Sequence, residues 1–156
     1  MSKVYYTCKM PYGIITIGSD GKSITSIKID NKAKPDGNKS VDKLINKAAE
    51  QLEEYFAGKR KKFDMPLNPC GTEFQRSVWK ALEEIPYGEI RSYKDIAIAI
   101  GNPNACRAVG LANSKNPIWI VIPCHRVIGA KGTLTGYGGG LEMKQRLLDL
   151  EKARIE

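Results

Sequence analysis

The chain has 156 residues, with 25 Lys and Arg against 17 Asp and Glu, so its formal net charge is 25 − 17 = +8. Hydrophobic residues make up 42% and charged residues 27%, which is typical of a globular protein and excludes a mainly disordered chain. The longest apolar run, near residues 118–123, is far shorter than the roughly 20 residues of a membrane-spanning helix, and the start MSKVYYTCKM has no signal-peptide core. We therefore expect a cytoplasmic protein that does not enter a membrane.

The positive charge is concentrated in two blocks. Residues 1–65 carry 13 − 8 = +5 and residues 86–131 carry 6 − 2 = +4, whereas the segments 66–85 and 132–156 are close to neutral. A basic chain can neutralise the phosphates of a nucleic acid, but many basic proteins bind none. Charge alone therefore does not identify a partner.

The four cysteines are scattered, without a CxxC pair, and the chain has a single histidine. This pattern predicts free thiols rather than disulfides. A tetrahedral zinc site needs three or four clustered ligands, so we expect no metal.

The first part of the chain predicts a small antiparallel sheet followed by a helix. Apolar alternation separated by turn residues marks three strands, within residues 4–8, 13–18 and 24–29. A helix is expected from about Val41 to Ala57, ended by Gly58, and a short strand at 63–65. The apolar face of this helix would be formed by Leu44, Ala48, Leu52, Tyr55 and Phe56. The Pro, Asn and Gly residues of 66–71 indicate a domain boundary, giving domains 1–66 and 67–156.

The second part is predicted to be mostly helical. Thr72 caps a helix that ends before Pro86, Ser92 caps a second that stops at Gly101, and a third runs from about residue 103 or 104 to 114. The last two have the outline of a helix-turn-helix, although proteins that never touch DNA share it. A final helix is expected from Leu141 to about residue 153, packing through Leu141, Leu147, Leu148 and Leu150.

The third of these helices combines small side chains with one long cation, Arg107. Its small residues are Ala105, Ala108, Gly110 and Ala112. They are consistent either with tight packing in the core or with close approach to DNA, with Arg107 projecting into the duplex.

The apolar run 118–122 predicts a buried strand or extended segment that leads into Cys124, His125 and Arg126. A thiol beside a histidine and cations can be drawn toward thiolate, the nucleophilic form. Adjacent residues of an extended segment point in opposite directions, so His125 is expected to act on the sulfur through a bridging water. A downstream carboxylate would orient the histidine. The candidates are Glu142, Asp149 and Glu151.

A glycine-rich loop follows at 129–140. It lacks the spacing of a phosphate-binding loop, and its exposed backbone N–H groups suit close wrapping of a flat ligand.

Together these motifs resemble the O6-alkylguanine-DNA alkyltransferases, also called methylated-DNA–protein-cysteine methyltransferases. The resemblance covers residues 71–151 almost without gaps, whereas residues 1–65 match only in the order of their elements. The matching blocks are Gly71–Gln75 with Val78-Trp79, Ile85–Glu89 with Ser92-Tyr93, Gly101–Pro103 with Arg107–Gly110, Asn116-Pro117, Ile122–Val127, and Gly136-Tyr137 with Gly140-Leu141 and Lys144.

The resemblance implies an α+β protein with a ribonuclease H-like N-terminal domain and a helical, winged-helix-like C-terminal domain carrying a helix-turn-helix. It implies DNA repair by direct reversal: the alkyl group of O6-alkylguanine, and of O4-alkylthymine, is transferred irreversibly to a cysteine of the protein. Each molecule would act once, as a monomer and without a cofactor, on double-stranded DNA bound through the minor groove.

The family's site residues can be carried onto matching positions. In catalysis, the resemblance implies Cys124 as acceptor, His125 as its activator through water, Glu151 as the carboxylate that orients the histidine, and Asn116 as the residue that braces the site. For the flipped base it implies Tyr93, Val127 and Gly138, and for DNA it implies Arg107, which fills the vacated space, with Ala105, Ala108 and Arg126. The family's zinc ligands, present in some relatives, are missing here.

Two alternatives remain at this stage. A module that only recognises alkylated guanine would lack the acceptor cysteine. A cysteine hydrolase using Cys124 and His125 would turn over many substrate molecules, whereas an alkyl acceptor takes at most one group.

Overall fold

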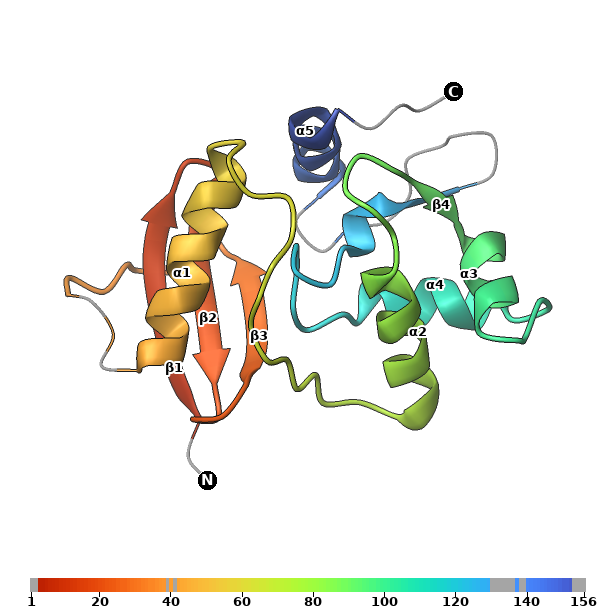
Figure 1. Ribbon diagram of the computed structural model, residues 1–156, viewed down its shortest axis with the longest axis horizontal. Helices are drawn as coiled ribbons and strands as arrows, with labels where there is room; N and C mark the ends of the chain where they lie inside the picture. The colour runs from red at the N-terminus through yellow and green to blue at the C-terminus, as the bar shows by residue number, and fades with distance from the viewer. Residues whose placement is uncertain (1–2, 39, 41, 130–136, 138–139, 153–156) are drawn as a thin grey trace. The chain divides into compact units, whose positions relative to one another are not determined.

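The computed structural model describes residues 3–38, 40, 42–129, 137 and 140–152. The chain forms two compact units (Figure 1). Unit 1 comprises residues 1–70 together with 117–119, and unit 2 comprises residues 71–116 and 120–156. The chain thus leaves unit 2 for three residues and then returns to it.

Unit 1 contains the predicted antiparallel meander, in the order β1-β2-β3. The strands are β1 (Val4–Met10), β2 (Gly13–Ser19) and β3 (Ile24–Ile29). Ile17 pairs with Tyr6 on one side and with Ile27 on the other, and the buried side chains of β2 and β3 supply much of the core. The mixture of this sheet with helices confirms the predicted α+β class.

Helix α1 (Lys43–Phe56) packs on β2 and β3 and lies across the sheet in Figure 1. The Asp42 side chain caps its first turn, and Gly58 follows its end with φ +76°, a conformation that favours glycine. Its buried face differs from the prediction, since Ile45 and Gln51 are buried as well and Leu44 is only half-buried.

The strand predicted at residues 63–65 is wrong. The backbone N–H and C=O of Asp64 bond to the Gln51 side chain, at 2.9 and 3.0 Å, instead of to a neighbouring strand. This segment pairs with β3 further along the chain, where Leu67 forms a parallel bridge with Ile24.

The buried strand or extended segment predicted at 118–122 is buried at alternate residues but is interrupted by a turn. Residues 117–119 pair with β3, because Ile27 N–H donates to Pro117 O and Trp119 N–H donates to Ile27 O, both at 2.9 Å. The chain then turns at Ile120, whose φ is +74°. The alternation of burial survives this turn, which explains why the sequence pattern resembled one strand.

Unit 2 is built mainly from four helices among its described residues. They are α2 (Glu73–Glu83), α3 (Tyr93–Ala99), α4 (Cys106–Ser114) and α5 (Leu141–Glu151). Thr72 and Ser92 cap α2 and α3 as predicted, and each cap is part of a capping box. Short strands β4 (Arg91–Ser92) and β5 (Val127–Ile128) pair in parallel.

Two details of these helices differ from expectation. Helix α4 begins at Cys106 because Ala105 has a non-helical backbone. In α5, Leu141 is 49% exposed, and Met143 and Lys144 are buried in addition to Leu147 and Leu148.

No helix in the described part of the chain is both long enough and apolar enough to cross a membrane.

Candidate active site

The Cys-His-Arg sequence forms a single 3-10 turn, η1 (Cys124–Arg126), directly before β5. All three side chains are buried, with Cys124 4% and Arg126 6% exposed. The prediction that neighbouring residues here point in opposite directions is therefore wrong, because successive residues of a 3-10 turn are separated by about 120°.

Burial sets the protonation state of the nucleophile candidate. Cys124 is a free thiol, and burial raises its pKa to about 11, although the Asn116 side chain and the positive charge of Lys144 both act to lower it. At neutral pH the group is a thiol. A base must therefore take its proton before the sulfur can attack.

His125 is completely buried and paired with a carboxylate. Its Nε2 lies 2.6 Å from Glu151 Oε2. Burial acts to raise the pKa of Glu151, but hydrogen bonds and charges from His125 and Arg126 outweigh it and lower this pKa to about 2. Because the carboxylate is ionised, Nε2 carries the hydrogen, and Nδ1 is then the unprotonated nitrogen of a neutral ring. Nδ1 has no hydrogen-bond partner among the described residues.

Of the three carboxylates that sequence reasoning considered, α5 brings only Glu151 to the histidine. Glu142 and Asp149 lie on the exposed face of the same helix.

Asparagines at the end of α4 contact the same turn. Asn116 Nδ2 donates to Ile122 O at 2.8 Å, and Asn113 Nδ2 approaches Cys124 O at 3.5 Å. Asn116 was predicted at the site, whereas Asn113 was not. Its spacing of three residues from Asn116 would have been the available signal.

Lys144 is a second residue without a predicted role. Its ammonium group is 0% exposed, and Nζ donates to Val127 O at 2.5 Å. Burial lowers its pKa to about 8, and Cys124 acts in the opposite direction. The apolar residues Met143, Leu147 and Leu148 at helical spacing already placed Lys144 on the buried face of α5.

Arg126, which was predicted to contact DNA, has its side-chain partners inside the protein. Nε and Nη2 donate to the two Glu151 carboxylate oxygens at 2.7 and 3.0 Å, and Nη1 donates to Ile85 O at 2.6 Å. The guanidinium also lies 5.7 Å from the centre of the Tyr87 ring. A side chain with these partners is not available to a phosphate.

The other predicted DNA and base contacts lie on α3 and α4. Arg107 and Ala108 are exposed and Ala105 is half-buried, at the start of α4. Tyr93 begins α3, and its ring passes close enough to Gly110 that an added Cβ there would lie 3.8 Å away. Gly138 lies outside the described residues.

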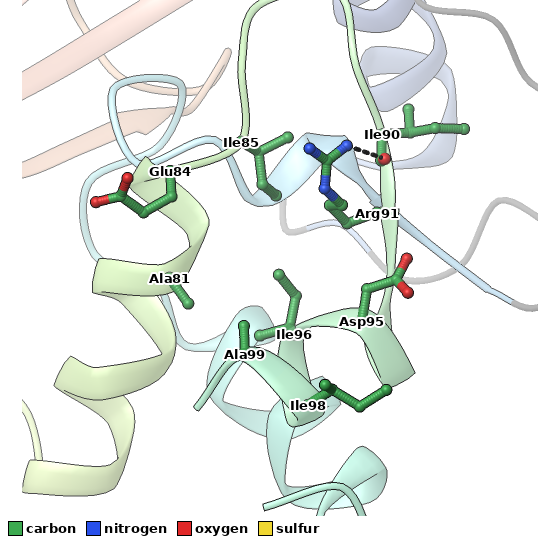
Figure 2. A pocket seen from close by; sticks show the side chains of 9 residues that line it. All are labelled: Ala81, Glu84, Ile85, Ile90, Arg91, Asp95, Ile96, Ile98 and Ala99. Atoms are coloured by element: carbon green, nitrogen blue, oxygen red, sulfur yellow. Dashed lines mark hydrogen bonds between the residues drawn. The ribbon is translucent and has the colours of Figure 1, made fainter. Parts of the chain in front are cut away.

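A cavity of about 500 Å³ lies near the end of α2 and beside α3 (Figure 2), and Cys124 is not among the residues that line it. Its walls combine aliphatic side chains with Glu84, Arg91 and Asp95. Arg91 is committed to Glu89 and to the Ile90 carbonyl, and Asp95 accepts from the Ser92 backbone N–H. No cysteine or histidine lines the cavity, so we place the site at the Cys124 turn. Within the described ranges, no group of three or more Cys, His, Asp and Glu side chains could hold a metal ion.

Comparison with known proteins identifies similar sequences over both units. Residues 73–153 match the sequence model of the 6-O-methylguanine DNA methyltransferase DNA binding domain, and residues 3–69 match that of the ribonuclease-like domain of the same proteins. A methylated-DNA–protein-cysteine methyltransferase of Methanosarcina acetivorans is 51% identical over 153 residues, covering 95% of this chain and 98% of the relative. One of Mycolicibacterium paratuberculosis is 52% identical over 151 residues, covering 95% and 92%.

Among solved structures, the Mycobacterium tuberculosis OGT in complex with DNA is similar, with a TM-score of 0.86 and 49% identity. The match covers 95% of this chain and 92% of that one.

Proposed function

This chain belongs to the 6-O-methylguanine DNA methyltransferase family, the methylated-DNA–protein-cysteine methyltransferases, and on that premise we propose that Cys124 is its alkyl acceptor. Its reaction is DNA repair by direct reversal, in which the methyl group of O6-methylguanine is transferred to a cysteine of the protein. The observation that carries the assignment is the free thiol of Cys124 in the same turn as His125, which pairs with the buried carboxylate of Glu151 from α5.

The transfer requires one bond to form and one to break. The Cys124 sulfur attacks the alkyl carbon, forming a thioether, while the bond from that carbon to guanine O6 breaks. The thiol proton passes to His125 Nδ1 through a bridging water, and the guanine regains its carbonyl form by taking up a proton on the ring. Glu151 holds the histidine through Nε2 and stabilises the positive charge that appears on the imidazole.

The remaining predicted residues receive roles in binding. A guanine stacked in the duplex cannot present O6 for in-line attack, so the nucleotide must be flipped out, at a cost of a few kcal/mol. The exposed start of α4, with Ala105 and Ala108 beside Arg107, suits close approach to the minor groove and insertion of the arginine into the vacated space. Tyr93 and backbone groups of Val127 and Gly138 would hold the flipped base.

The product explains why each molecule acts once. A thioether has no bond that water readily hydrolyses, so the cysteine is not regenerated and no cofactor is required. The acceptor must begin as a reduced thiol, which supports action in the cytoplasm, where thiols are kept reduced.

The test is the intact mass of the protein after incubation with a duplex containing one O6-methylguanine. We expect each molecule to gain the mass of one methylene, and peptide mapping to locate the methyl group on Cys124. Cys124→Ser should gain nothing, while the matched variant Cys106→Ser should react like the original chain.

The same measurement separates the alternatives. An unmodified protein that still binds the duplex would indicate a recognition module. Several damaged bases repaired by each molecule, with no gain in mass, would indicate a hydrolytic enzyme. Either result would refute the proposal.

A further inference from the structure

Glu151 is shared by two hydrogen-bond donors, the imidazole of His125 and the guanidinium of Arg126. One oxygen, Oε2, accepts from His125 Nε2 and from Arg126 Nη2, and the other, Oε1, accepts from Arg126 Nε. The carboxylate and the imidazole are buried, and the guanidinium nearly so. Removing charged groups from water is expensive unless they are paired with good geometry, so this arrangement needs an explanation.

We propose that Arg126 is a positioning residue for the alkyl transfer: by holding Glu151 through two hydrogen bonds, it keeps His125 as a neutral imidazole with Nδ1 as its basic nitrogen. The inference rests on the proposed function, because it assigns His125 the role of proton acceptor for Cys124.

The first step of the argument is the charge balance around the imidazole. The titratable and charged groups near it are Glu151 and Lys144 from α5, Cys124 and Arg126 from η1, and Tyr137 from the segment before α5. With the thiol and the phenol neutral, two cations already face one carboxylate. A protonated His125 would be a third cation in a buried cluster.

The second step concerns what Glu151 would do without Arg126. A buried carboxylate paired only with a histidine favours the imidazolium, because the proton neutralises an otherwise isolated charge. Arg126 supplies that neutralising charge permanently, since a guanidinium does not lose its proton in proteins. The pKa of His125 is lowered by burial first, and the charges of Arg126 and Lys144 act in the same direction while Glu151 opposes them. A neutral histidine can accept the thiol proton, whereas a protonated one cannot.

The third step is geometric. The guanidinium is fixed on further sides by its bond to Ile85 O and by the Tyr87 ring. Its planar fork therefore holds both carboxylate oxygens in one orientation, and this sets the direction of the His125 ring. A lysine would supply charge but not two parallel donors.

The experiment uses the fact that the chain has one histidine. Nitrogen-15 NMR of the imidazole therefore reports on His125 without assignment. In the original chain at pH 7 we expect a neutral ring with hydrogen on Nε2. In Arg126→Met we expect the pKa of His125 to rise. The acid limb of the pH–rate profile for methyl transfer should then move to higher pH by about one unit or more, so that the rate at a pH on this limb falls about tenfold.

Two further variants separate charge from geometry. Arg126→Lys should keep the imidazole neutral at pH 7 but transfer more slowly, because one bond to Glu151 is lost. Arg60→Met removes the same charge from an arginine that pairs with Glu54 at 2.9 Å in unit 1, and it should leave both the spectrum and the profile unchanged.

The proposal is overturned if the original chain shows a protonated ring or hydrogen on Nδ1 at pH 7, a result that needs no variant to fold. It is also overturned if His125 in folded Arg126→Met titrates as it does in the original chain. If Arg126→Met does not fold, a protonated His125 ring at pH 7 in Arg126→Lys overturns the proposal. The spectra need no DNA, so failure here is distinct from a failure of Cys124 to gain a methyl group.

Discussion

A buried thiol reacts slowly until it loses its proton, and in this site the charge that favours that loss comes from a buried lysine. Lys144 lowers the pKa of Cys124 against the larger effect of burial. The same ammonium donates to the carbonyl of Val127, the first residue after the Cys-His-Arg turn. One side chain therefore affects both the electrostatics of the sulfur and the position of the chain that follows it.

Replacing Lys144 with Met should slow methyl transfer by about tenfold or more at pH 7, because a change of one unit in the thiol pKa changes the thiolate fraction tenfold. The rate is measured in single-turnover reactions with a methylated duplex. Lys43→Met, at an exposed position of α1, removes the same charge and should transfer normally. Equal rates for the two variants would show that the Lys144 charge does not act on Cys124.

Much of this site could be predicted from local sequence, but its orientation could not. Cys124 and His125 are neighbours, so a nucleophile beside a base is visible without a fold. Glu151 lies 26 residues from the histidine, and from the residues alone it could not be distinguished from the other carboxylates of its helix. Arg126 was assigned to DNA from the family resemblance, and its partners inside the protein depend on a 3-10 turn that the local sequence pattern did not predict.

At the scale of elements, the burial pattern of α4 is compatible with both interpretations of its small residues. Val109 and Ala112 are buried, and Ala112 O accepts from Trp79 Nε1 of α2 at 2.8 Å. Arg107 and Ala108 point to solvent on the opposite side. Small residues allow close packing on one face. On the other face they leave a surface from which only one long cation, Arg107, extends.

Arg107→Ala should therefore reduce repair of O6-methylguanine in duplex DNA far more than reaction with the free methylated base, which needs no flipping. The two reactions are compared in single-turnover rates, with Arg76→Ala on the exposed face of α2 as the control for lost positive charge. An equal loss on both substrates would contradict a role for Arg107 in opening the duplex.

Helix α2 depends on a close approach at its start. An added Cβ on Gly71 would lie 2.5 Å from the Trp79 ring and 2.7 Å from Gln75 Oε1, which belongs to the capping box. In α4, by contrast, a Cβ on Gly110 would make an ordinary contact of 3.8 Å with Tyr93.

Replacing each of the two glycines with alanine should change the free energy of unfolding in opposite directions. Gly71→Ala should lower the free energy of unfolding by about 1–3 kcal/mol through overpacking. Gly110→Ala should raise it by up to about 1 kcal/mol, because alanine favours a helix interior. Denaturant unfolding measures both, and Gly37→Ala, with open space around it, is the reference. A stable Gly71→Ala variant would mean that Trp79 can move without cost.

At the scale of the whole molecule, the path of the chain joins the two units covalently at an informative place. Ile118 is completely buried in unit 1, while Asn116 before it and Ile120 after it belong to unit 2. Sequence patterns showed the apolar run but not its division, because alternating burial is the same for one strand and for a strand followed by a turn. The positive φ of Ile120, where the chain turns away from Ile27, distinguishes them.

This path predicts that a substitution of Ile118 in unit 1 affects the reaction of Cys124 in unit 2. Ile118→Ala should lower the free energy of unfolding by about 2–5 kcal/mol, as expected for a buried isoleucine. It should also slow methyl transfer at temperatures where the protein is folded, because Asn116, two residues away, holds the Ile122 carbonyl beside Cys124. The matched variant Ile45→Ala removes an equally buried isoleucine from α1, so its unfolding free energy should fall similarly while its transfer rate is retained.

If both variants transfer at the original rate, residues 117–119 stabilise unit 1 without positioning the Cys124 turn. If both are equally slow, general loosening of unit 1 is the cause rather than the path of the chain.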